Sequence, residues 1–451
     1  MIFNNRAIFI LIYGLFLGFV LSFLYAGPIL NYVNLKISSD LLLLIIFMSG
    51  ILSCIFTYHH NINITPKILS ISIIVNISFS ILLYLLCQFA NNNIACMTSY
   101  ISAGLVGFSA MFTSNSLLSI SKNNNKFNEI FINMGLVMLI ANAISYSVYI
   151  LLSFKLKNTA FFLALLSVVI TIPLCFKVNY KQVKNNLNVI FYKGNIFSFA
   201  MLIFLIKISE GIIYKIVEHE FAIHQTNYEY TYIIPYVLAL FVAIIFLYKT
   251  KRHLFSLLSL CISLIGIGML FILFSEKGIF ISNFLMHFGL GLLDIIIWGG
   301  LVYLIHVYDN GYKISSFIMF FHMLGVFMGG FISEFYLYER ELIYFVAIIS
   351  IFLSFMITAK VCSITNDVEN KKKQLDQDKE KKAKLKSKEK YKLLTKREQQ
   401  VVSLILLGKI NRVIAQELNI SETTVKTHCK NIYVKLGIKS KKEVKLIFND
   451  N

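Results

Sequence analysis

Charged side chains are scarce in this chain of 451 residues: they make up 14% of it, against 57% hydrophobic residues. Soluble domains carry about a quarter charged residues, so this composition argues against an ordinary soluble protein and is typical of a membrane protein. Proline is scarce too, with four residues in all, which indicates helices with few interruptions.

Paired cysteines are also lacking. The seven cysteines are scattered with no CxxC pair, and most lie in or beside apolar runs, so we interpret them as small hydrophobic residues rather than disulfide partners or metal ligands. The sequence also has no nucleophile–base arrangement, metal-ligand spacing or phosphate loop. We therefore expect no enzyme activity, no metal and no cofactor. No phosphate-accepting receiver module precedes the C-terminal domain, so activation by phosphorylation is not indicated.

Twelve apolar stretches come close to the length needed for a ~30 Å hydrocarbon core, about 20 residues each. The first is longer than the ~7–15 apolar residues of a cleavable signal peptide, so we favour a retained helix over a cleaved signal. The expected spans are Ala7–Ala26, Leu41–Tyr58, Ile68–Phe89, Ile94–Ile120, Ile130–Phe154, Ala160–Phe176, Ile196–Tyr214, Tyr230–Tyr248, Leu254–Phe274, Ile279–Val307, Ile314–Phe335 and Leu342–Ala359.

The basic residues of the loops set the expected orientation, because cytoplasmic loops carry an excess of lysine and arginine. With the N-terminus inside, inside loops hold twelve such residues and outside loops hold six. An even number of spans then returns the C-terminus to the cytoplasm. We expect a multi-pass protein of the inner (cytoplasmic) membrane with both termini cytoplasmic.

The longest inside loop, Lys177–Lys193, divides the spans into two groups of six. Two six-helix halves joined by a basic cytoplasmic loop resemble the major facilitator superfamily, over most of the first 360 residues. The resemblance implies an all-α, twelve-helix bundle. The loop between spans two and three reads Tyr58-His59-His60-Asn61-Ile62-Asn63 and lacks the family's Gly/Asp/Arg-rich motif, which argues against transport by the usual gating.

Ionisable side chains at membrane depth cost about 2.5–3.5 kcal/mol each on insertion scales and are candidates for function. Lys207 and Glu210 are three residues apart, on one helix face. In the facilitator resemblance, spans one, four, seven and ten line a central cavity. The implied ligand pocket comprises Lys207, Glu210, Asp294, Trp298, Tyr13 and Asn115. The alternative is structural: Lys207 and Glu210 neutralise each other, Asp294 bonds a hydroxyl or an amide, and His287 and His322 are core imidazoles.

A charged linker follows the spans. Asn366–Lys392 holds eleven lysines and six acidic residues with almost no large apolar side chain, so it cannot bury a core. We interpret it as a solvated spacer, either helical or disordered, with contact to anionic lipid as the less favoured alternative.

The last sixty residues have the pattern of four short helices. Thr395 and Glu398 form a capping box, and Gly408 ends the first helix. Ser421 caps a third helix that runs to about Leu436. Its apolar face carries Val425, Cys429, Ile432 and Leu436, and its opposite face carries Thr423, Lys426, Thr427, Lys430 and Val434. This is the layout of a helix that reads DNA. The fourth helix is expected to expose Val444 and Ile447 to a partner.

The run Leu394-Thr-Lys-Arg-Glu398, Gly408-Lys-Ile-Asn411 and Leu418-Asn-Ile-Ser-Glu-Thr-Thr-Val-Lys-Thr-His428, continued by Asn431-Ile432 and Lys435-Leu-Gly437, closely resembles the LuxR-type helix-turn-helix. The resemblance implies that Lys426, Thr427 and Lys430 approach bases, and that Thr424, His428, Asn431 and Lys435 lie along the sugar-phosphate backbone. It also implies two-fold half-sites and hence a homodimer on DNA. Ile410 stands where the family commonly has a serine or threonine cap, with Asn411 as a substitute.

These features divide the chain into a membrane domain (1–360), a charged cytoplasmic linker (361–392) and a DNA-binding domain (393–451). The leading hypothesis is a membrane-bound one-component transcription regulator, which senses a ligand or a membrane condition and binds promoter DNA. Its expected partners are promoter DNA, the lipid bilayer, an unidentified small molecule and a second copy of the chain. The alternative is a secondary transporter with a fused regulatory DNA-binding tail.

Overall fold

The computed structural model describes residues 5–23, 29, 39–60, 64–89, 93–120, 127–177, 193–223, 234–249, 257–274, 278–307, 311–335, 338–339, 341–358, 360–361 and 390–448. The contacts divide the chain into two compact units, Met1–Ser363 and Ile364–Asn451. Residues 362–389, which make up nearly all of the predicted linker, lie outside the described residues.

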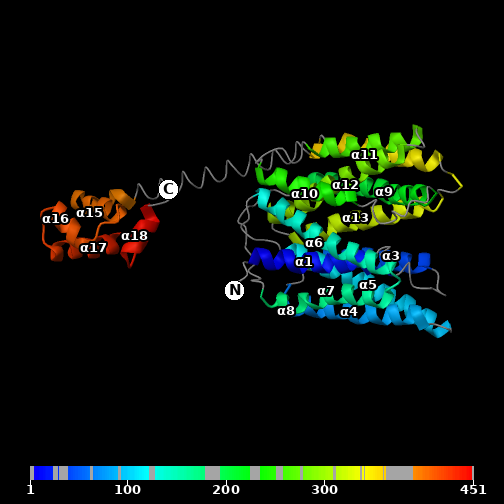
Figure 1. Ribbon diagram of the computed structural model, residues 1–451. Coiled ribbons are helices and arrows are strands. Elements are labelled where there is room, and N and C mark those ends of the chain that lie inside the picture. The colour runs from blue at the N-terminus through cyan, green and yellow to red at the C-terminus, as the bar shows by residue number, and fades with distance from the viewer. Residues whose placement is uncertain are drawn as a thin grey trace. The chain divides into compact units, whose positions relative to one another are not determined.

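The first unit is a bundle of apolar helices (Figure 1). Ten of its described helices are long and apolar enough to cross a membrane, and two shorter apolar ones lie where spans eight and nine were expected. The helices are α1 (Asn5–Phe23), α3 (Ser39–His59), α4 (Pro66–Phe89), α5 (Asn93–Ile120), α6 (Phe127–Ser153), α7 (Lys157–Val169), α8 (Thr171–Cys175), α9 (Lys193–Ile223), α10 (Ile234–Lys249), α11 (Leu257–Phe274), α12 (Ile279–Val307), α13 (Gly311–Ser333) and a further helix over Glu341–Thr358. The predicted all-α, twelve-span bundle is confirmed.

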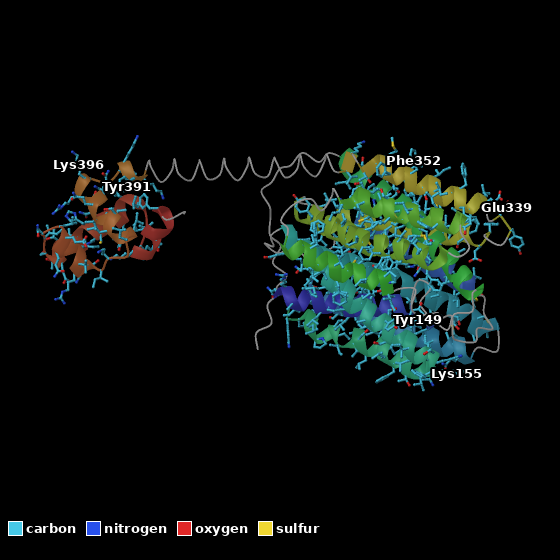
Figure 2. All side chains as sticks on the ribbon, turned by 45° about the horizontal axis from the view of Figure 1, so that its top comes forward. Tyr149, Lys155, Glu339, Phe352, Tyr391 and Lys396 are labelled. Atoms are coloured by element: carbon cyan, nitrogen blue, oxygen red, sulfur yellow. The ribbon has the colours of Figure 1, made fainter. Side chains whose placement is uncertain are left out.

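The outer faces of this bundle are apolar and suited to contact with lipid. Large apolar side chains are exposed on many of its helices; Phe162 is 64% exposed and Phe352 is 61% exposed. Phe352 is labelled in Figure 2. α12 lies at the core instead, because 89% of its most apolar segment is buried, against 33–67% for the other nine long spans. The chain is therefore a multi-pass membrane protein organised around α12, which contacts α5, α6, α9, α10, α11 and α13.

Three prolines explain where helices begin and break. Pro66 is the first residue of α4 and Pro235 is the second of α10, positions where the missing N–H costs no helical hydrogen bond. Pro173 divides the predicted span Ala160–Phe176 into α7 and α8, which meet at Ile170. The proline has no N–H to donate to the carbonyl of Val169, the last residue of α7, so the helix cannot continue unbroken.

α9 and α13 touch backbone to backbone through two glycines one turn apart. A methyl group added at Gly325 would lie 2.7 Å from the carbonyl oxygen of Phe204 and 2.9 Å from Cβ of Lys207. At Gly329 it would lie 2.5 Å from the carbonyl oxygen of Ile208. Glycines at this spacing let membrane helices approach closely without interlocking side chains. They bring α13 against the turn of α9 that carries Lys207.

The second unit has its own apolar core and, over the described residues 390–448, four helices: α15 (Lys396–Leu406), α16 (Asn411–Glu417), α17 (Glu422–Leu436) and α18 (Lys441–Phe448). The capping box of Thr395 and Glu398 is present as predicted. One prediction was wrong: Val444 is fully buried in the core rather than exposed to a partner, because α18 packs against α15. The side chain of Ile447 lies outside the described residues.

The start of α16 has no side-chain cap. Ile410 occupies the N-cap position and is 63% exposed. Asn411 does not substitute for it as predicted, because Asn411 is already the first helical residue and its Oδ1 accepts from Nζ of Lys441 (3.3 Å). The family's hydroxyl cap is therefore lost without a replacement.

We expect Ile410→Ser to stabilise the DNA-binding domain by roughly 0.5–2 kcal/mol, because a serine hydroxyl would accept one of the free N–H groups at the start of α16. Urea unfolding of residues 390–451, followed by circular dichroism, measures the change. Ile410→Ala is the matched control, since it removes the apolar side chain without adding an acceptor. Equal unfolding midpoints for the serine and alanine variants would contradict the capping explanation.

Candidate functional site

The exposed face of α17 carries most of the predicted DNA-binding side chains. Its buried face consists of Val425, Cys429, Ile432 and Leu436. The exposed side chains are Thr423, Thr424, Lys426, Thr427, Lys430, Asn431 and Lys435, and His428 is half-buried. Burial of one face thus fixes which side chains face outward, as the 3/4 spacing predicts. The structure shows where these residues lie; their contacts with DNA stay a prediction.

Both ends of α17 are well defined. The hydroxyl of Ser421 accepts from the backbone N–H of Thr424 (3.1 Å), so the helix begins at a satisfied cap. Gly437 has a left-handed conformation with φ 67° and ends the helix, a conformation that glycine adopts without strain. A helix fixed at both ends can present Lys426 and Lys430, one turn apart, in a constant geometry.

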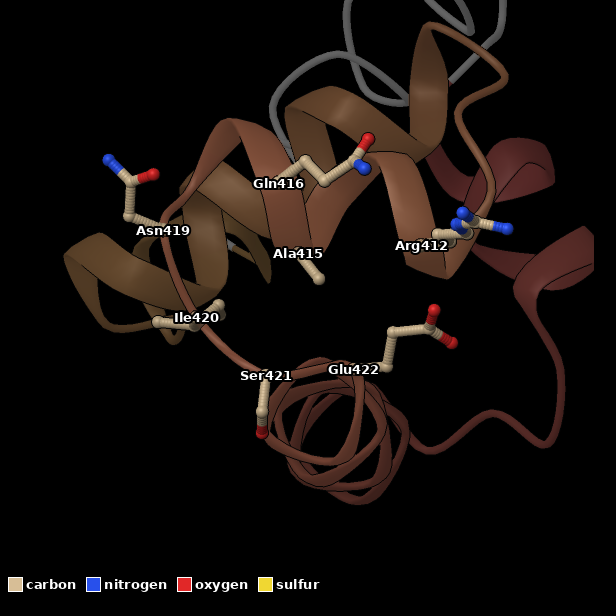
Figure 3. A pocket seen from close by; sticks show the side chains of 7 residues that line it. All are labelled: Arg412, Ala415, Gln416, Asn419, Ile420, Ser421 and Glu422. Carbon is tan, nitrogen blue, oxygen red and sulfur yellow. The ribbon is translucent and has the colours of Figure 1, made fainter.

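A groove of about 580 Å³ lies between α16 and the start of α17 (Figure 3). Arg412 from α16 and Glu422 from α17 stand on opposite walls, so the groove offers charge of both signs. It is lined by Arg412, Ala415, Gln416, Asn419, Ile420, Ser421 and Glu422. Asn419 forms the tight turn between the two helices with a positive φ of 49°, which asparagine tolerates better than most residues.

Lys435 has a protein partner that the sequence analysis did not foresee. Its Nζ donates to Oε2 of Glu398 (2.7 Å), the same oxygen that accepts from the backbone N–H of Thr395 (2.7 Å). Glu398 is only 3% exposed. Burial acts to raise the pKa of the Glu398 carboxyl, but hydrogen bonds from Lys435 and Thr395 and the charge of Lys435 outweigh it and hold that pKa below its usual 4.5.

The lowered pKa of Glu398 makes the stability of the domain depend on pH. A carboxyl whose pKa is lower in the folded than in the unfolded state stabilises the fold above its unfolded pKa, about 4.3. That contribution is lost as the pH falls through the folded pKa. We expect the urea midpoint of residues 390–451 to fall below about pH 4.3, and Glu398→Gln to reduce this dependence. An identical acid profile for the variant would contradict the assignment to Glu398.

In the membrane domain, three of the predicted pocket residues meet in one buried ion network. Nζ of Lys207 donates to Oε2 of Glu210 (2.5 Å) and to Oδ1 of Asp294 (3.0 Å). Lys207 is 3% exposed and Asp294 is 6% exposed. The network joins α9 to α12, spans seven and ten of the facilitator resemblance.

Tyr236 is a fourth member of this network, which the sequence did not predict. Its hydroxyl, on α10, donates to Oδ2 of Asp294 (2.7 Å), so both oxygens of Asp294 have a partner. The only sequence signal was a tyrosine following Pro235 near the start of a span, which does not distinguish it from the other tyrosines of the chain. Lys207, Glu210, Tyr236 and Asp294 are called the ion network below.

The other predicted pocket residues have partners of their own. Trp298, one turn after Asp294 on α12, packs on His322 of α13 with ring centroids 5.4 Å apart. Tyr13 is paired with Ser114 (3.4 Å). Asn115 donates to Thr57 (3.4 Å) and Cys54 (3.8 Å). These hydrogen bonds of Tyr13 and Asn115 join α1, α3 and α5, and a pocket shared with the ion network stays a prediction.

Comparison with known proteins identifies the family that the second unit resembles. Residues 392–448 match the luxR family of bacterial regulatory proteins (GerE). The HTH-type transcriptional regulator MalT of Vibrio campbellii is 54% identical over 50 residues, and that of Yersinia pestis (strain Pestoides F) is 50% identical over 50 residues. Each match covers 11% of this chain and 6% of the relative, so the likeness is confined to the DNA-binding domain.

Solved structures resemble the first unit. A bacterial homologue of the iron transporter ferroportin, in an outward-facing state, superposes with a TM-score of 0.62 at 11% identity, covering 80% of this chain and 100% of that one. The major facilitator superfamily transporter FucP, in the outward conformation, gives 0.57 at 10% identity, covering 80% and 99%. Identities this low establish a shared fold alone. The chain thus joins a LuxR-type helix-turn-helix domain, which is a DNA-binding regulatory domain, to a membrane domain with the major facilitator fold.

Proposed function

We propose that this chain is a membrane-bound one-component transcription regulator, which senses a ligand or a membrane condition through its helix bundle and binds promoter DNA through residues 393–451. The observation that carries the proposal is the covalent union of a LuxR-type domain with a multi-pass membrane fold in one chain. Attaching a DNA-binding domain to a membrane domain allows the membrane domain to control DNA binding.

The ion network is the part of the membrane domain best suited to respond. Lys207 supplies one positive charge, while Glu210 and Asp294 supply two negative charges when both are ionised, so the network has a formal charge of −1. Burying uncompensated charge is costly. A proton or a small cationic ligand would neutralise the network and would favour one arrangement of α9, α10 and α12 over another. Such differential binding is what a population shift requires.

We expect Asp294→Asn to abolish the response while the protein still folds and binds DNA. The substitution leaves Lys207 and Glu210 as a neutral pair, and the asparagine carbonyl can still accept from Tyr236. A promoter reporter in cells grown across a panel of pH values, salts and small cations measures the response. A wild-type response that persists in Asp294→Asn would remove the ion network from sensing.

The proposal requires both termini in the cytoplasm of the inner membrane, as the lysine and arginine bias of the loops predicts. A reporter enzyme fused after Asn451 is expected to be active in the cytoplasm. Paired fusions in the loops after α3 and α4 are expected to report opposite sides of the membrane. A periplasmic C-terminus would end the regulatory proposal.

Pairing of two chains on DNA is part of the same proposal. It is supported by the LuxR-type fold, whose resemblance implies two-fold related half-sites. Mass measurement of the protein on one half-site and on two half-sites tests it. Single-copy binding to the two-site duplex would contradict it.

A second candidate function is secondary transport with a regulatory tail, which the likeness to transporter structures favours. Flux measured in vesicles separates the two. Concentrative uptake that depends on Glu210 or Asp294 would favour transport, whereas promoter control without flux would favour the regulator.

A further inference from the structure

The first turn of α15 contacts the helix-turn-helix at two places. Nη2 of Arg397 donates to the backbone carbonyl of Leu418, at the turn between α16 and α17 (2.5 Å). The neighbouring Glu398 accepts from Nζ of Lys435, in the last turn of α17 (2.7 Å). Two adjacent side chains therefore hold the turn before the recognition helix and the last turn of that helix.

The same turn also holds the end of the linker and the first residues of the DNA-binding domain. Nε2 of Gln399 donates to the backbone carbonyls of Tyr391 and Leu394, 3.1 Å in each case. The Tyr391 hydroxyl donates back to the carbonyl of Gln399 (3.3 Å), and its ring meets Phe448 edge to face at 5.7 Å. Leu394 is buried in the core. A displacement of the chain at residue 391 would therefore act directly on this turn and on Phe448 of α18.

The hydrogen bonds that the first turn of α15 makes to the helix-turn-helix are of the strong kind, which suits this turn to position α17. Hydrogen bonds with an ionised partner are roughly twice as strong as neutral ones, and both contacts to the helix-turn-helix are of this kind. Glu398 is 3% exposed while the Lys435 side chain is 38% exposed, so the pair is screened by solvent at its lysine end only. The surface pair Lys409–Glu417 (3.0 Å), with side chains 39–40% exposed, gives the contrast within the same domain.

We propose that residues 395–399, the linker-proximal turn, set the placement of the recognition helix α17 and pass the state of the membrane domain to it. Arg397 and Glu398 are positioning residues that act through Leu418 and Lys435, and Gln399 couples the turn to the chain that enters from the linker. The coupling part rests on the proposed function, whereas the positioning part needs only DNA binding by the LuxR-type domain.

The positioning part is tested by sequence preference, because a loss of stability alone does not change which bases a folded domain selects. The probe is a duplex selected from a random library by the full chain in lipid nanodiscs, compared with its scrambled sequence. We expect Glu398→Ala to reduce the preference by about tenfold, and Glu398→Gln to restore part of it, since an amide oxygen still accepts from Thr395 and Lys435. Glu417→Ala is the matched control and is expected to leave the preference unchanged.

An unchanged preference in a folded Glu398→Ala chain would overturn the positioning role. Should that variant fail to fold, Arg397→Gln keeps the Glu398–Lys435 ion pair and tests the other contact by the same measurement. A full chain that selects no sequence at all would instead contradict the proposed function, so the two failures are distinguishable.

The coupling part is tested by comparing the full chain with residues 390–451, which have their own core. The measured quantity is the ratio of their affinities for the selected duplex. We expect Gln399→Ala to bring this ratio closer to one by about threefold or more, with little change in the affinity of the fragment. Ser403→Ala, whose hydroxyl bonds only within its own helix (2.8 Å to the carbonyl of Gln400), is the control. A wild-type ratio of one, or equal losses in chain and fragment, would overturn the coupling.

Discussion

Replacing Lys207 with alanine is expected to destabilise the membrane domain by about 3–5 kcal/mol, because it removes one partner of a buried ion pair and leaves its carboxylates uncompensated. Glu210 and Asp294 both bond the Lys207 ammonium, so a single substitution leaves two such groups. Thermal unfolding in detergent measures the loss. The only tryptophan of the chain, Trp298, lies one turn from Asp294 and supplies the fluorescence signal.

The matched control removes the carboxylates together with the ammonium. We expect the triple variant Lys207→Ala, Glu210→Gln, Asp294→Asn to recover much of the lost stability, because amides cost less to bury than unpaired carboxylates. Asp294→Asn alone should be tolerated, since it leaves a neutral pair. A Lys207→Ala protein as stable as the wild type would show that the network does not hold α9, α10 and α12 together.

Lys426→Ala is expected to weaken promoter binding by about 1–3 kcal/mol and to change the preferred sequence, if its ammonium reads a base edge as the LuxR resemblance implies. The side chain is exposed on α17, one turn from Lys430. Binding of residues 390–451 to the selected duplex and to its single-base variants, measured by fluorescence anisotropy, provides the test.

Lys439→Ala is the matched control for this second prediction, because Lys439 is an exposed lysine outside α17. It is expected to cause a smaller loss with unchanged preference. Salt dependence separates the two kinds of contact: each lysine that neutralises a phosphate steepens the fall of affinity with salt by about one in log–log slope. An Lys426→Ala domain with unaltered affinity and preference would place that lysine outside the readout.

Features that the chain encodes locally were predicted well. Membrane spans are long apolar runs, and the structure has helices at all twelve predicted positions. The buried and exposed faces of α17 follow from the 3/4 spacing of Val425, Cys429, Ile432 and Leu436. Lys207 and Glu210 were recognised as neighbours because they are three apart on one helix, and the structure pairs them.

Features that depend on contacts between distant segments were missed. Tyr236 joins the ion network across 58 positions of sequence, and Lys435 bonds Glu398 across 37. No periodicity signals such pairs. Val444 was expected on the surface because the predicted fourth helix had no assigned neighbour, whereas α15 covers it. The placement of Asp294 beside Lys207 was anticipated only through the resemblance to a known fold, which supplies the missing long-range information.

The glycine contact between α9 and α13 has a mechanical consequence. Gly325 and Gly329 present no side chains to lock into α9, and the backbone they touch spans Phe204 to Ile208, around Lys207. The two helices resist separation because their backbones are already in contact, and Phe321 of α13, which packs edge to face on Phe197 and Phe204 of α9, opposes sliding along the helix axis. A single methyl group placed at Gly329 would push on the charged turn of α9 without altering any charge. In this bundle, a change in helix packing can therefore displace the ion network as directly as a change in charge.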